Sequence, residues 1–199
     1  TETLLTGHPG PLTDMQHRVL DTVYSSAQRL NRLIEEILTV SRIQRGTLRL
    51  KHESFDPSQL FSQLREPLTL LATRQQVQLQ FSDTKHAEVM CTGDAVLLEQ
   101  ALANLISNAI KFSASGQSVE VRSESVHGTW RVEVEDHGMG IPEVDLPDLF
   151  QRFTRGSNAK KAQIQGTGLG LYVAKAIIEG HGGEIHLTSQ EGIGTTIWF

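Results

Sequence analysis

The sequence contains a single cysteine, Cys91, so its 199 residues cannot form an internal disulfide bond. The lack of disulfides favours a reducing compartment. No apolar run approaches the ~20 residues that cross a bilayer, and residues 1–10 do not have the charged-then-apolar layout of a signal peptide. These absences predict a cytoplasmic chain without membrane contact, or a piece of a longer protein that is itself anchored in a membrane.

Positive charge is also scarce, because 18 Lys and Arg residues stand against 23 Asp and Glu residues, with a formal net charge of -5 and no basic run. A chain of this charge repels polyanions, so we expect no nucleic-acid partner. A bound nucleotide would need local cations. The composition, 38% hydrophobic and 21% charged, is typical of one or two globular domains of modest size.

A long stretch without Gly or Pro runs from Thr13 to Gln44. Within it, apolar residues recur at alternating spacings of three and four, the pattern of a heptad seam on a long helix. The seam consists of Leu20, Val23, Ala27, Leu30, Ile34 and Ile37. Further apolar residues widen the stripe, so we expect more than one helical neighbour, with a single amphipathic core helix as the alternative. Residues 7–11, Gly-His-Pro-Gly-Pro, predict a bend ahead of the helix.

The apolar spacing changes to two after Gly46, in the sequence Leu-Arg-Leu-Lys of residues 48–51. This alternation predicts a short strand. We therefore expect a domain boundary near Gly46, with a helical stem in residues 1–46 and a second domain in residues 47–199.

Helix and strand signals are mixed along the second domain. Asp56 and Pro57 predict the start of a helix reaching about Arg74, and Asp94 predicts the N-cap of a helix through Phe112. Because the two kinds of element do not alternate strictly, we expect an α+β fold, a two-layer α/β sandwich with helices on one face of a mixed sheet. The other expected elements are strands at 77–81, 118–123, 129–135, 184–188 and 195–199 and a helix near 169–179.

Three polar residues share one face of the helix that ends at Phe112. Asn104, Asn108 and Lys111 are spaced by four and three residues. An amide oxygen can coordinate Mg²⁺, and an ammonium group can meet a phosphate as a point charge. A polar solvent-facing stripe is the alternative interpretation.

A second motif, Asp-His-Gly-Met-Gly-Ile at residues 136–141, follows an alternating strand. A carboxylate at a strand end can accept a hydrogen bond from the exocyclic amine of adenine, and two glycines allow the backbone to approach a planar ring. Taken alone, this pattern is more often a simple turn.

The 29 residues from His137 to Gln165 show little regular pattern, a length that compact domains usually reserve for a functional lid. Within them, Leu149, Phe150 and Phe153 lie beside two arginines, Arg152 and Arg155, which suggests an apolar plug that carries a guanidinium. A lid over ATP is the interpretation we favour, and a helical turn in a loop is the alternative.

A third motif, Gly-Thr-Gly-Leu-Gly-Leu at residues 166–171, opens a predicted helix, whose free N–H groups attract phosphate oxygens. It is neither a P-loop nor a dinucleotide fingerprint, because no Gly-Lys-Ser/Thr ends it and no strand directly precedes it. A fourth, Gly-Ile-Gly-Thr at residues 192–195, is consistent with a hairpin turn.

In this order, the motifs resemble those of the ATPase superfamily shared by DNA gyrase, the large heat-shock chaperones, mismatch-repair ATPases and sensor histidine kinases. The resemblance is closest to the histidine kinases. Residues 104–112 look like their Asn-rich box, 136–140 their adenine motif, 149–155 their Phe-bearing lid motif and 166–171 their phosphate loop. Residues 38–46 are similar to the end of the second helix of their dimerisation hairpin.

The resemblance implies an enzyme that binds ATP with Mg²⁺. Asp136 would bond adenine, with Thr195 acting through water, Asn108 would hold Mg²⁺, and Arg155 would approach the terminal phosphate. Asn104 and Lys111 would contact the phosphate region, so that Asn104, Asn108, Lys111 and Arg155 form the catalytic set. The implied nucleotide-binding residues are Asn104, Asn108, Lys111, Phe112, Asp136, Gly138, Gly140, Ile141, Phe153, Arg155, Gly166, Thr167, Gly168, Leu169, Gly170 and Thr195.

The sequence departs from the family at the phosphoacceptor, which is expected in a His-Glu/Asp-x-x-x-Pro-Leu motif. His8 lies in a proline-broken segment, and His17 is followed by Arg18 and Val19. We therefore expect residues 1–46 to be a residual dimerisation stem whose phosphoacceptor helix is largely missing. The resemblance also implies a homodimer through the stem and a response regulator receiver domain as partner.

Two other functions remain open. A nucleotide-binding regulatory module without transfer activity is the first, although the intact motifs argue against degeneration. A hydrolytic member of the superfamily is the second, but such enzymes place a general-base Glu where Asn104 stands.

Overall fold

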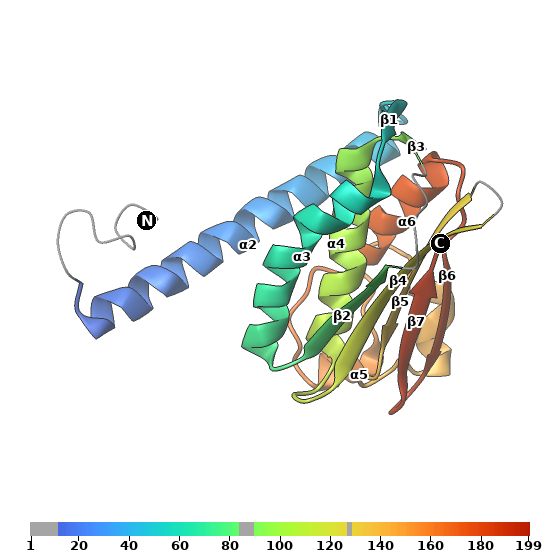
Figure 1. Ribbon diagram of the computed structural model, residues 1–199. Coiled ribbons are helices and arrows are strands. Elements are labelled where there is room, and N and C mark those ends of the chain that lie inside the picture. The colour runs from blue at the N-terminus through green and yellow to red at the C-terminus, as the bar shows by residue number, and fades with distance from the viewer. Residues whose placement is uncertain (1–11, 84–89, 127–128) are drawn as a thin grey trace. The chain divides into compact units, whose positions relative to one another are not determined.

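The computed structural model in Figure 1 describes residues 12–83, 90–126 and 129–199. The chain divides into two compact units, Thr1–Thr47 and Leu48–Phe199. The bend predicted at residues 7–11 and the histidine within it, His8, lie outside the described residues.

The first unit is dominated by one helix, α2 (Asp14–Gln44), as the sequence predicts. Thr13 caps it through a reciprocal pair of hydrogen bonds, in which the Gln16 N–H donates to Thr13 Oγ1 at 3.3 Å and the Thr13 N–H donates to Gln16 Oε1 at 2.8 Å. Several seam residues are exposed, with 58% of Leu30 and 47% of Ile37 accessible to solvent. The helix therefore presents an apolar stripe.

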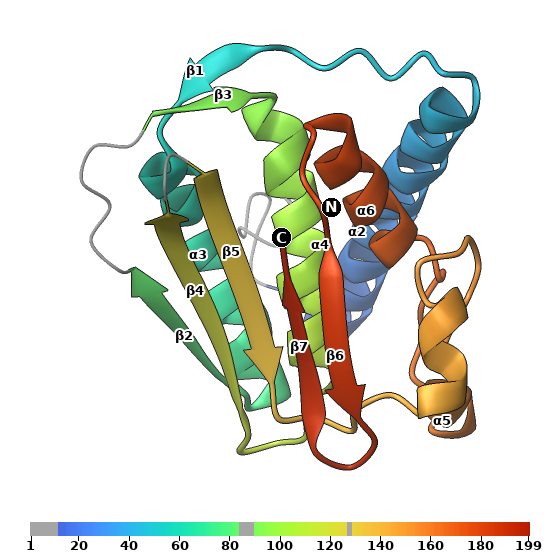
Figure 2. The ribbon, with the colours of Figure 1, turned by 90° about the vertical axis from the view of Figure 1, so that its right-hand side faces the viewer.

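The second unit is built on a five-stranded sheet with the order β2-β4-β5-β7-β6 (Figure 2). The β2–β4 pair is parallel and the other three pairs are antiparallel, so the sheet is mixed. A separate two-stranded sheet pairs β1 with β3. The strands are β1 (Glu53–Phe55), β2 (Gln78–Asp83), β3 (Cys91–Gly93), β4 (Ser118–Val126), β5 (Thr129–Asp136), β6 (His186–Gln190) and β7 (Gly194–Trp198).

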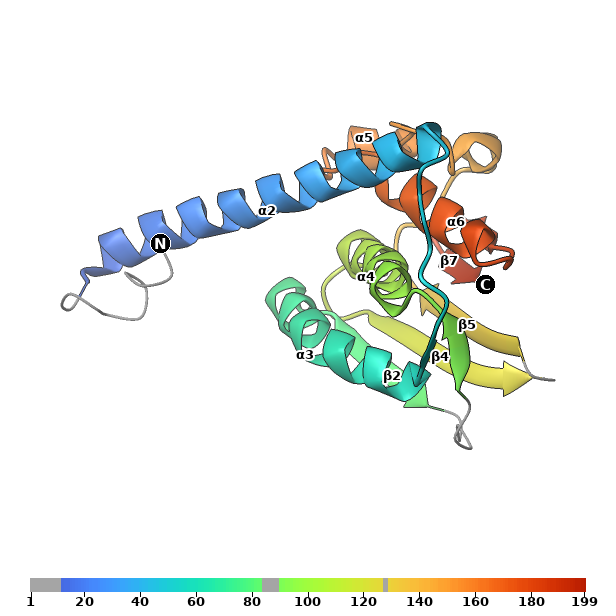
Figure 3. The same ribbon diagram turned by 90° about the horizontal axis from the view of Figure 1, so that it is seen from above.

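Helices α3 (Pro57–Gln75), α4 (Ala95–Phe112) and α6 (Gly170–Gly180) form a single layer over one face of this sheet, as Figure 3 shows. The predicted two-layer α+β fold is therefore confirmed. Two shorter helical segments, η1 (Glu143–Asp148) and α5 (Ser157–Lys161), lie within the segment predicted to be a lid. Of the helices that the structure describes, none combines the length and hydrophobicity needed to cross a bilayer.

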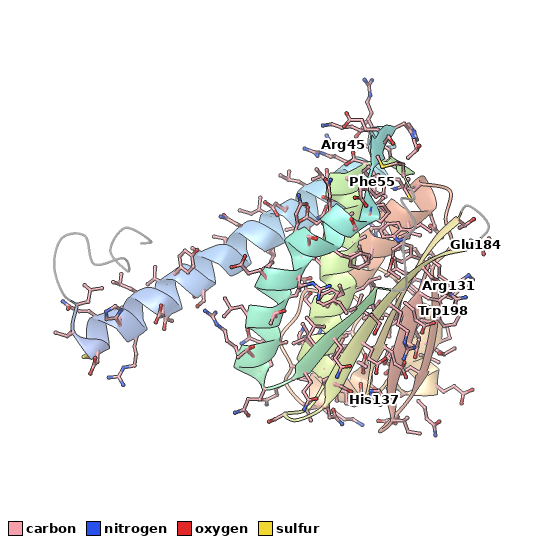
Figure 4. All side chains as sticks on the ribbon, viewed as in Figure 1. Arg45, Phe55, Arg131, His137, Glu184 and Trp198 are labelled. Atoms are coloured by element: carbon pink, nitrogen blue, oxygen red, sulfur yellow. The ribbon has the colours of Figure 1, made fainter. Side chains whose placement is uncertain are left out.

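The two faces of the sheet differ in chemistry because strand residues alternate between them. Val132 and Val134 of β5 are buried beneath the helices, together with Leu102 and Ile106 of α4. Arg131 of β5 and Trp198 of β7 lie on the other side of the sheet (Figure 4). On that side, the Arg122 guanidinium contacts three carboxylates within 2.7 Å, those of Glu120, Glu133 and Glu135.

A hydrogen-bonded histidine joins the start of α4 to the end of α6. The Asp94 N–H donates to His181 Nε2 at 2.9 Å, so Nε2 carries the lone pair. The hydrogen is therefore on Nδ1, which donates to the Ile177 carbonyl oxygen at 2.7 Å. Gly93 leaves room for the ring, because an added Cβ there would lie 2.7 Å from it.

The strand predicted at residues 48–51 is wrong. The structure has no strand there, and the first strand is instead β1, which begins at Glu53. Leu50 packs against Gly180 of α6, and the Lys51 N–H donates to the Asp94 carboxylate at 3.2 Å. The alternating apolar residues therefore pack against α6. The Asp94 carboxylate accepts the Lys51 backbone hydrogen bond that a neighbouring strand would otherwise accept. Strand β3 was not predicted, since three residues show no period.

We expect the apolar stripe of α2 to drive self-association, because it would otherwise leave large aliphatic side chains in water. Leu30→Glu should shift the chain toward monomer in sedimentation velocity, since a buried unpaired charge is strongly unfavourable. Ser25→Glu adds the same charge at an exposed polar position and should leave the association unchanged. A wild-type chain that remains monomeric at high concentration would contradict this prediction.

Candidate nucleotide-binding site

The predicted motifs meet where α4 ends, β5 ends, β7 begins and the glycine-rich loop enters α6. Asp136 at the end of β5 is the direct register partner of Thr195 at the start of β7. His137, the next residue, marks this end of the sheet in Figure 4. Segments that are distant in sequence therefore supply one surface.

The polar row on α4 faces the start of α6. Asn104 is 9% exposed, and its Nδ2 donates to the Gly170 carbonyl oxygen at 3.4 Å. A Cβ added to Gly170 would lie 3.7 Å from the side chains of both Asn104 and Asn108. The two amides thus share one glycine as neighbour, and a simple solvent-facing stripe does not describe this arrangement.

The glycine-rich loop closes against the row and the lid. A Cβ at Gly166 would lie 2.7 Å from Lys111 Nζ, so this loop and the ammonium group are in contact range. Gly168 has φ +72, and a Cβ there would lie 2.7 Å from the backbone of Phe153. The loop is ordered from within by the Leu169 N–H, which donates to Thr167 Oγ1 at 3.2 Å. Leu169 itself is buried.

Asp136 is a carboxylate at a nearly buried position, with 8% of the residue exposed. Burial raises the pKa of its side chain to about 6, because the charged form loses water. Backbone N–H groups of Gly138 and Thr195 counter part of this effect, the first at 2.9 Å. A destabilised carboxylate that still has free acceptor capacity is suited to a ligand with N–H donors.

The backbone around Asp136 is packed too tightly for side chains. Gly140 has φ +59, and an added Cβ would lie 2.0 Å from the Gln190 carbonyl oxygen. At Gly138, an added Cβ would lie 2.3 Å from the Phe112 carbonyl oxygen, which accepts a hydrogen bond from the Met139 N–H at 3.1 Å. The last turn of α4 and the Asp136 motif are therefore joined through main-chain atoms. Ile141 follows directly and is half-buried.

The lid segment holds Phe153 and Arg155. Phe153 is 69% exposed and has φ +61, which is unusual for a residue with a side chain. The Arg155 guanidinium donates to the Ile164 carbonyl oxygen, so the lid itself holds it in this structure. It also lines a polar hollow of ≈ 400 Å³ formed by the lid residues Val144, Asp145, Asp148, Gln151, Arg152, Thr154, Arg155 and Lys160. The structure does not bring Arg155 onto the amide row.

Two residues of the site have no sequence signal that we recognised. Asn158 of α5 donates to the Gly140 carbonyl oxygen at 2.8 Å and so ties the lid to the Asp136 motif. Ser189 of β6 bonds the Ile141 N–H, the Gly194 carbonyl and the Thr195 hydroxyl. A single amide in a short helix and a single hydroxyl in a strand carry no pattern. Asn158 and Ser189 reach the site only because elements that are distant in the sequence pack together.

Comparison with known proteins follows the same division of the chain. The family described as "Histidine kinase-, DNA gyrase B-, and HSP90-like ATPase" matches residues 93–199. The chain belongs to this ATPase family. The His Kinase A (phospho-acceptor) domain matches residues 1–46. The predicted resemblance to a histidine kinase catalytic domain with part of the dimerisation region is therefore confirmed.

Relatives of the ATPase domain include sensor protein GacS of Pseudomonas syringae pv. syringae, 38% identical over 198 residues. These cover 94% of this chain but 21% of GacS, so the chain spans about a fifth of that relative. The histidine kinase AdeS of Acinetobacter baumannii has a TM-score of 0.71 at 26% identity, covering 99% of this chain and 93% of AdeS. Full-length ShkA, solved with AMPPNP, shares the fold with a TM-score of 0.76 at 22% identity, covering 97% of this chain and 40% of ShkA.

We expect Asp136 to reduce the stability of the unliganded domain as pH rises. Its pKa is about 6 in the folded chain, against an ordinary value of 3.8. The stability that the protonated form contributes is therefore complete below the lower value and is lost as the pH rises through the higher one. Asp136→Asn has no such proton to lose. The free energy of unfolding of Asp136→Asn, relative to that of wild type, should therefore rise by on the order of 1 to 3 kcal/mol between about pH 4 and about pH 7.5.

Urea unfolding of both proteins across this range, followed by Trp fluorescence, measures the difference. Glu124→Gln removes a carboxylate from an exposed position of β4 and serves as the control. A free-energy difference between wild type and Asp136→Asn that does not vary with pH would contradict the prediction.

Proposed function

We propose that this chain binds ATP with Mg²⁺ and transfers the γ-phosphoryl group to a histidine, from which a response regulator aspartate receives it. The observation that carries the proposal is the convergence of three features at one end of the domain. These are the buried carboxylate of Asp136, the Asn104–Asn108–Lys111 row, and the glycine-rich loop at the start of α6. Membership of the ATPase family supports this assignment of the ligand.

The base would lie against the Asp136 motif. The carboxylate accepts hydrogen bonds, so the exocyclic amine of adenine is the matching group. Gly138 and Gly140 let the main chain of this motif pack against the carbonyl oxygens of Phe112 and Gln190, which fixes the backbone beside the carboxylate. Thr195 is buried beside Asp136 and would help to hold the base. Phe112 and Ile141 border the same motif.

The phosphates would lie between the row on α4 and the loop before α6. Gly170 lies against the amides of Asn104 and Asn108, each 3.7 Å from an added Cβ, so the row and the loop are next to each other. Lys111 faces Gly166 across the loop and supplies positive charge. The N-terminus of α6 adds unpaired N–H groups and a favourable dipole. The residues present therefore fit a polyphosphate chain.

The Asn108 amide oxygen would hold Mg²⁺, as a hard neutral ligand of the kind the ion accepts. The described residues contain no group of three or more His, Cys, Asp or Glu side chains that could hold a metal ion. Mg²⁺ usually binds through one or two protein ligands together with substrate phosphates and waters. One amide beside a phosphate-binding loop matches this coordination preference. When bound, the ion would neutralise charge on the phosphates.

In the transfer step, the bond from the γ-phosphorus to the β–γ bridging oxygen breaks, and a bond from phosphorus to an imidazole nitrogen forms. ADP leaves with the bridging oxygen. The protein contributes alignment and charge neutralisation rather than covalent chemistry. Lys111 and Asn104 would hold the phosphate region, and Arg155 would approach the terminal phosphate after leaving the Ile164 carbonyl oxygen.

The receiving histidine is not one that the sequence pattern identifies in this chain. His17 lies exposed on α2 without the acidic neighbour of a phosphoacceptor. We propose that the stem supplies dimer contacts, and that the accepting imidazole belongs to a hairpin with the complete motif.

ATP and ADP should bind, and Asp136→Asn should weaken both by about 1.5 to 3 kcal/mol, because the adenine amine loses a charged acceptor. Asn108→Ala should reduce mainly the part of the affinity that depends on Mg²⁺. Titration calorimetry with and without Mg²⁺ separates the two effects. Glu124→Gln, which removes an exposed carboxylate of β4, should change neither. Unchanged affinity in Asp136→Asn would contradict the adenine assignment.

The isolated chain should bind ATP but not phosphorylate itself on histidine. Mixed with a dimerisation hairpin that carries the complete histidine motif, it should transfer the phosphoryl group slowly in trans, because no tether raises the effective concentration. Arg155→Ala should slow this transfer by more than it weakens ATP binding, since charge neutralisation matters most as the group moves.

Radiolabelled ATP and the acid lability of the labelled product measure the transfer, and Arg131→Ala, on the open face of the sheet, is the matched control. Acid-labile labelling of the isolated chain that disappears in His8→Ala or His17→Ala would contradict the prediction. ATP binding without transfer to any hairpin would instead favour a regulatory nucleotide-binding module.

A further inference from the structure

Ser189 of β6 is the centre of a hydrogen-bonded group beside the Asp136 motif. Its hydroxyl donates to the Gly194 carbonyl oxygen at 2.8 Å and accepts from the Ile141 N–H at 2.9 Å. A third contact joins Ser189 Oγ to Thr195 Oγ1 at 2.9 Å. The residue is half-buried, so these contacts are not made by a freely solvated side chain.

The direction of the third hydrogen bond follows from counting protons. A serine hydroxyl has one hydrogen, and a carbonyl oxygen can only accept, so the hydrogen of Ser189 is committed to Gly194. Thr195 must therefore donate in the contact between the two hydroxyls. Its single hydrogen is then used, and Thr195 Oγ1 can offer only lone pairs to any other group.

Thr195 occupies the central place in a row across three strands. It is the register partner of Ser189 on β6 and of Asp136 on β5. Directly opposed residues in antiparallel strands project to the same face of the sheet, with Cβ atoms about 5 Å apart. Asp136 and Thr195 are each 8% exposed. The two side chains therefore place a pair of acceptors next to each other on one face of the sheet.

We propose that Ser189 determines the base specificity of the site by fixing the Thr195 hydroxyl as a hydrogen-bond acceptor, which favours 6-aminopurines over 6-oxopurines. This inference rests on the nucleotide-binding function proposed above. Whatever meets Thr195 Oγ1, an amino group or a bridging water, has to donate to it. The amino edge of adenine supplies donors from N6, and its unprotonated N1 accepts the remaining hydrogen of such a water.

Asp136 alone is insufficient for this selection. A carboxylate can also accept from the N1–H of a 6-oxopurine, so it tolerates either class of base in a suitable pose. Where the base meets Thr195 Oγ1 directly, the second acceptor removes that tolerance, because the O6 atom of a 6-oxopurine would then face lone pairs. A Thr195 hydroxyl free to rotate could donate to O6 or to a water beside it. Ser189 prevents that rotation.

The test compares ATP with ITP, which replaces the 6-amino group with a 6-oxo group and leaves the ribose and phosphates unchanged. Calorimetric titration of the wild-type chain with Mg²⁺ should show ATP binding on the order of 100-fold more tightly than ITP. Ser189→Ala should lower that ratio by roughly tenfold, chiefly through improved ITP binding. Ser189→Thr keeps the hydroxyl and should preserve the ratio.

Three further variants make the outcome decisive. Thr195→Val removes the oriented hydroxyl and should lower the ratio even if Ser189→Ala does not fold. Combining Ser189→Ala with Thr195→Val should lower it no further than Thr195→Val alone. Thr188→Ala, at an exposed neighbour on β6, should leave it unchanged.

A purely structural role for Ser189 would weaken ATP and ITP by the same factor, and that result would overturn the inference. A ratio unchanged in Thr195→Val would overturn it as well. If the wild-type chain bound neither nucleotide, both the proposed function and this inference would fail. If the wild-type chain bound ATP but the ratio did not respond to these variants, the inference alone would fail.

Discussion

Helix α4, with its period of 3.6 residues, presents one side to the hydrophobic core and another side to the candidate site. Its core side, including Leu102, Leu105 and Ile106, is almost fully buried. The polar row that begins at Asn104 uses another side of the same turns and meets the start of α6 at Gly170. Because the buried side is close-packed, the row cannot shift without repacking the core. The positions of the amides are therefore set by the sheet beneath them.

Local signals in the sequence predicted the elements well where each signal had one physical cause. Asp94 caps α4 and Asp56 caps α3, as expected, because a side chain that satisfies free N–H groups fixes the start of a helix. The prediction failed at residues 48–51, where alternating apolar residues serve packing against α6 and no neighbouring strand pairs with them. The pairing of β1 with β3 joins segments almost forty residues apart, which no local period can reveal.

The candidate site shows the same limit. The motifs could be ordered from the sequence, and the shared helical face of Asn108 and Lys111 follows from their spacing. The contact between Lys111 and Gly166 depends on how α4 and α6 pack. Burial of Asp136 depends on strands that come later in the chain, as does the proton arrangement at Ser189. A raised pKa or an oriented hydroxyl depends on several elements at once, so local sequence motifs could not predict it.

The histidine that joins the two site-bearing helices has a mechanical consequence. His181 holds the first residue before α4 at the last turn of α6, whereas the amide row and the glycine-rich loop lie toward the opposite ends of these helices. A rigid tilt of α6 that preserves both hydrogen bonds of the imidazole therefore pivots near His181. Helix α6 has 11 residues, which gives a lever arm of about 16 Å, so that a tilt of about 4° displaces Gly170 by about 1 Å.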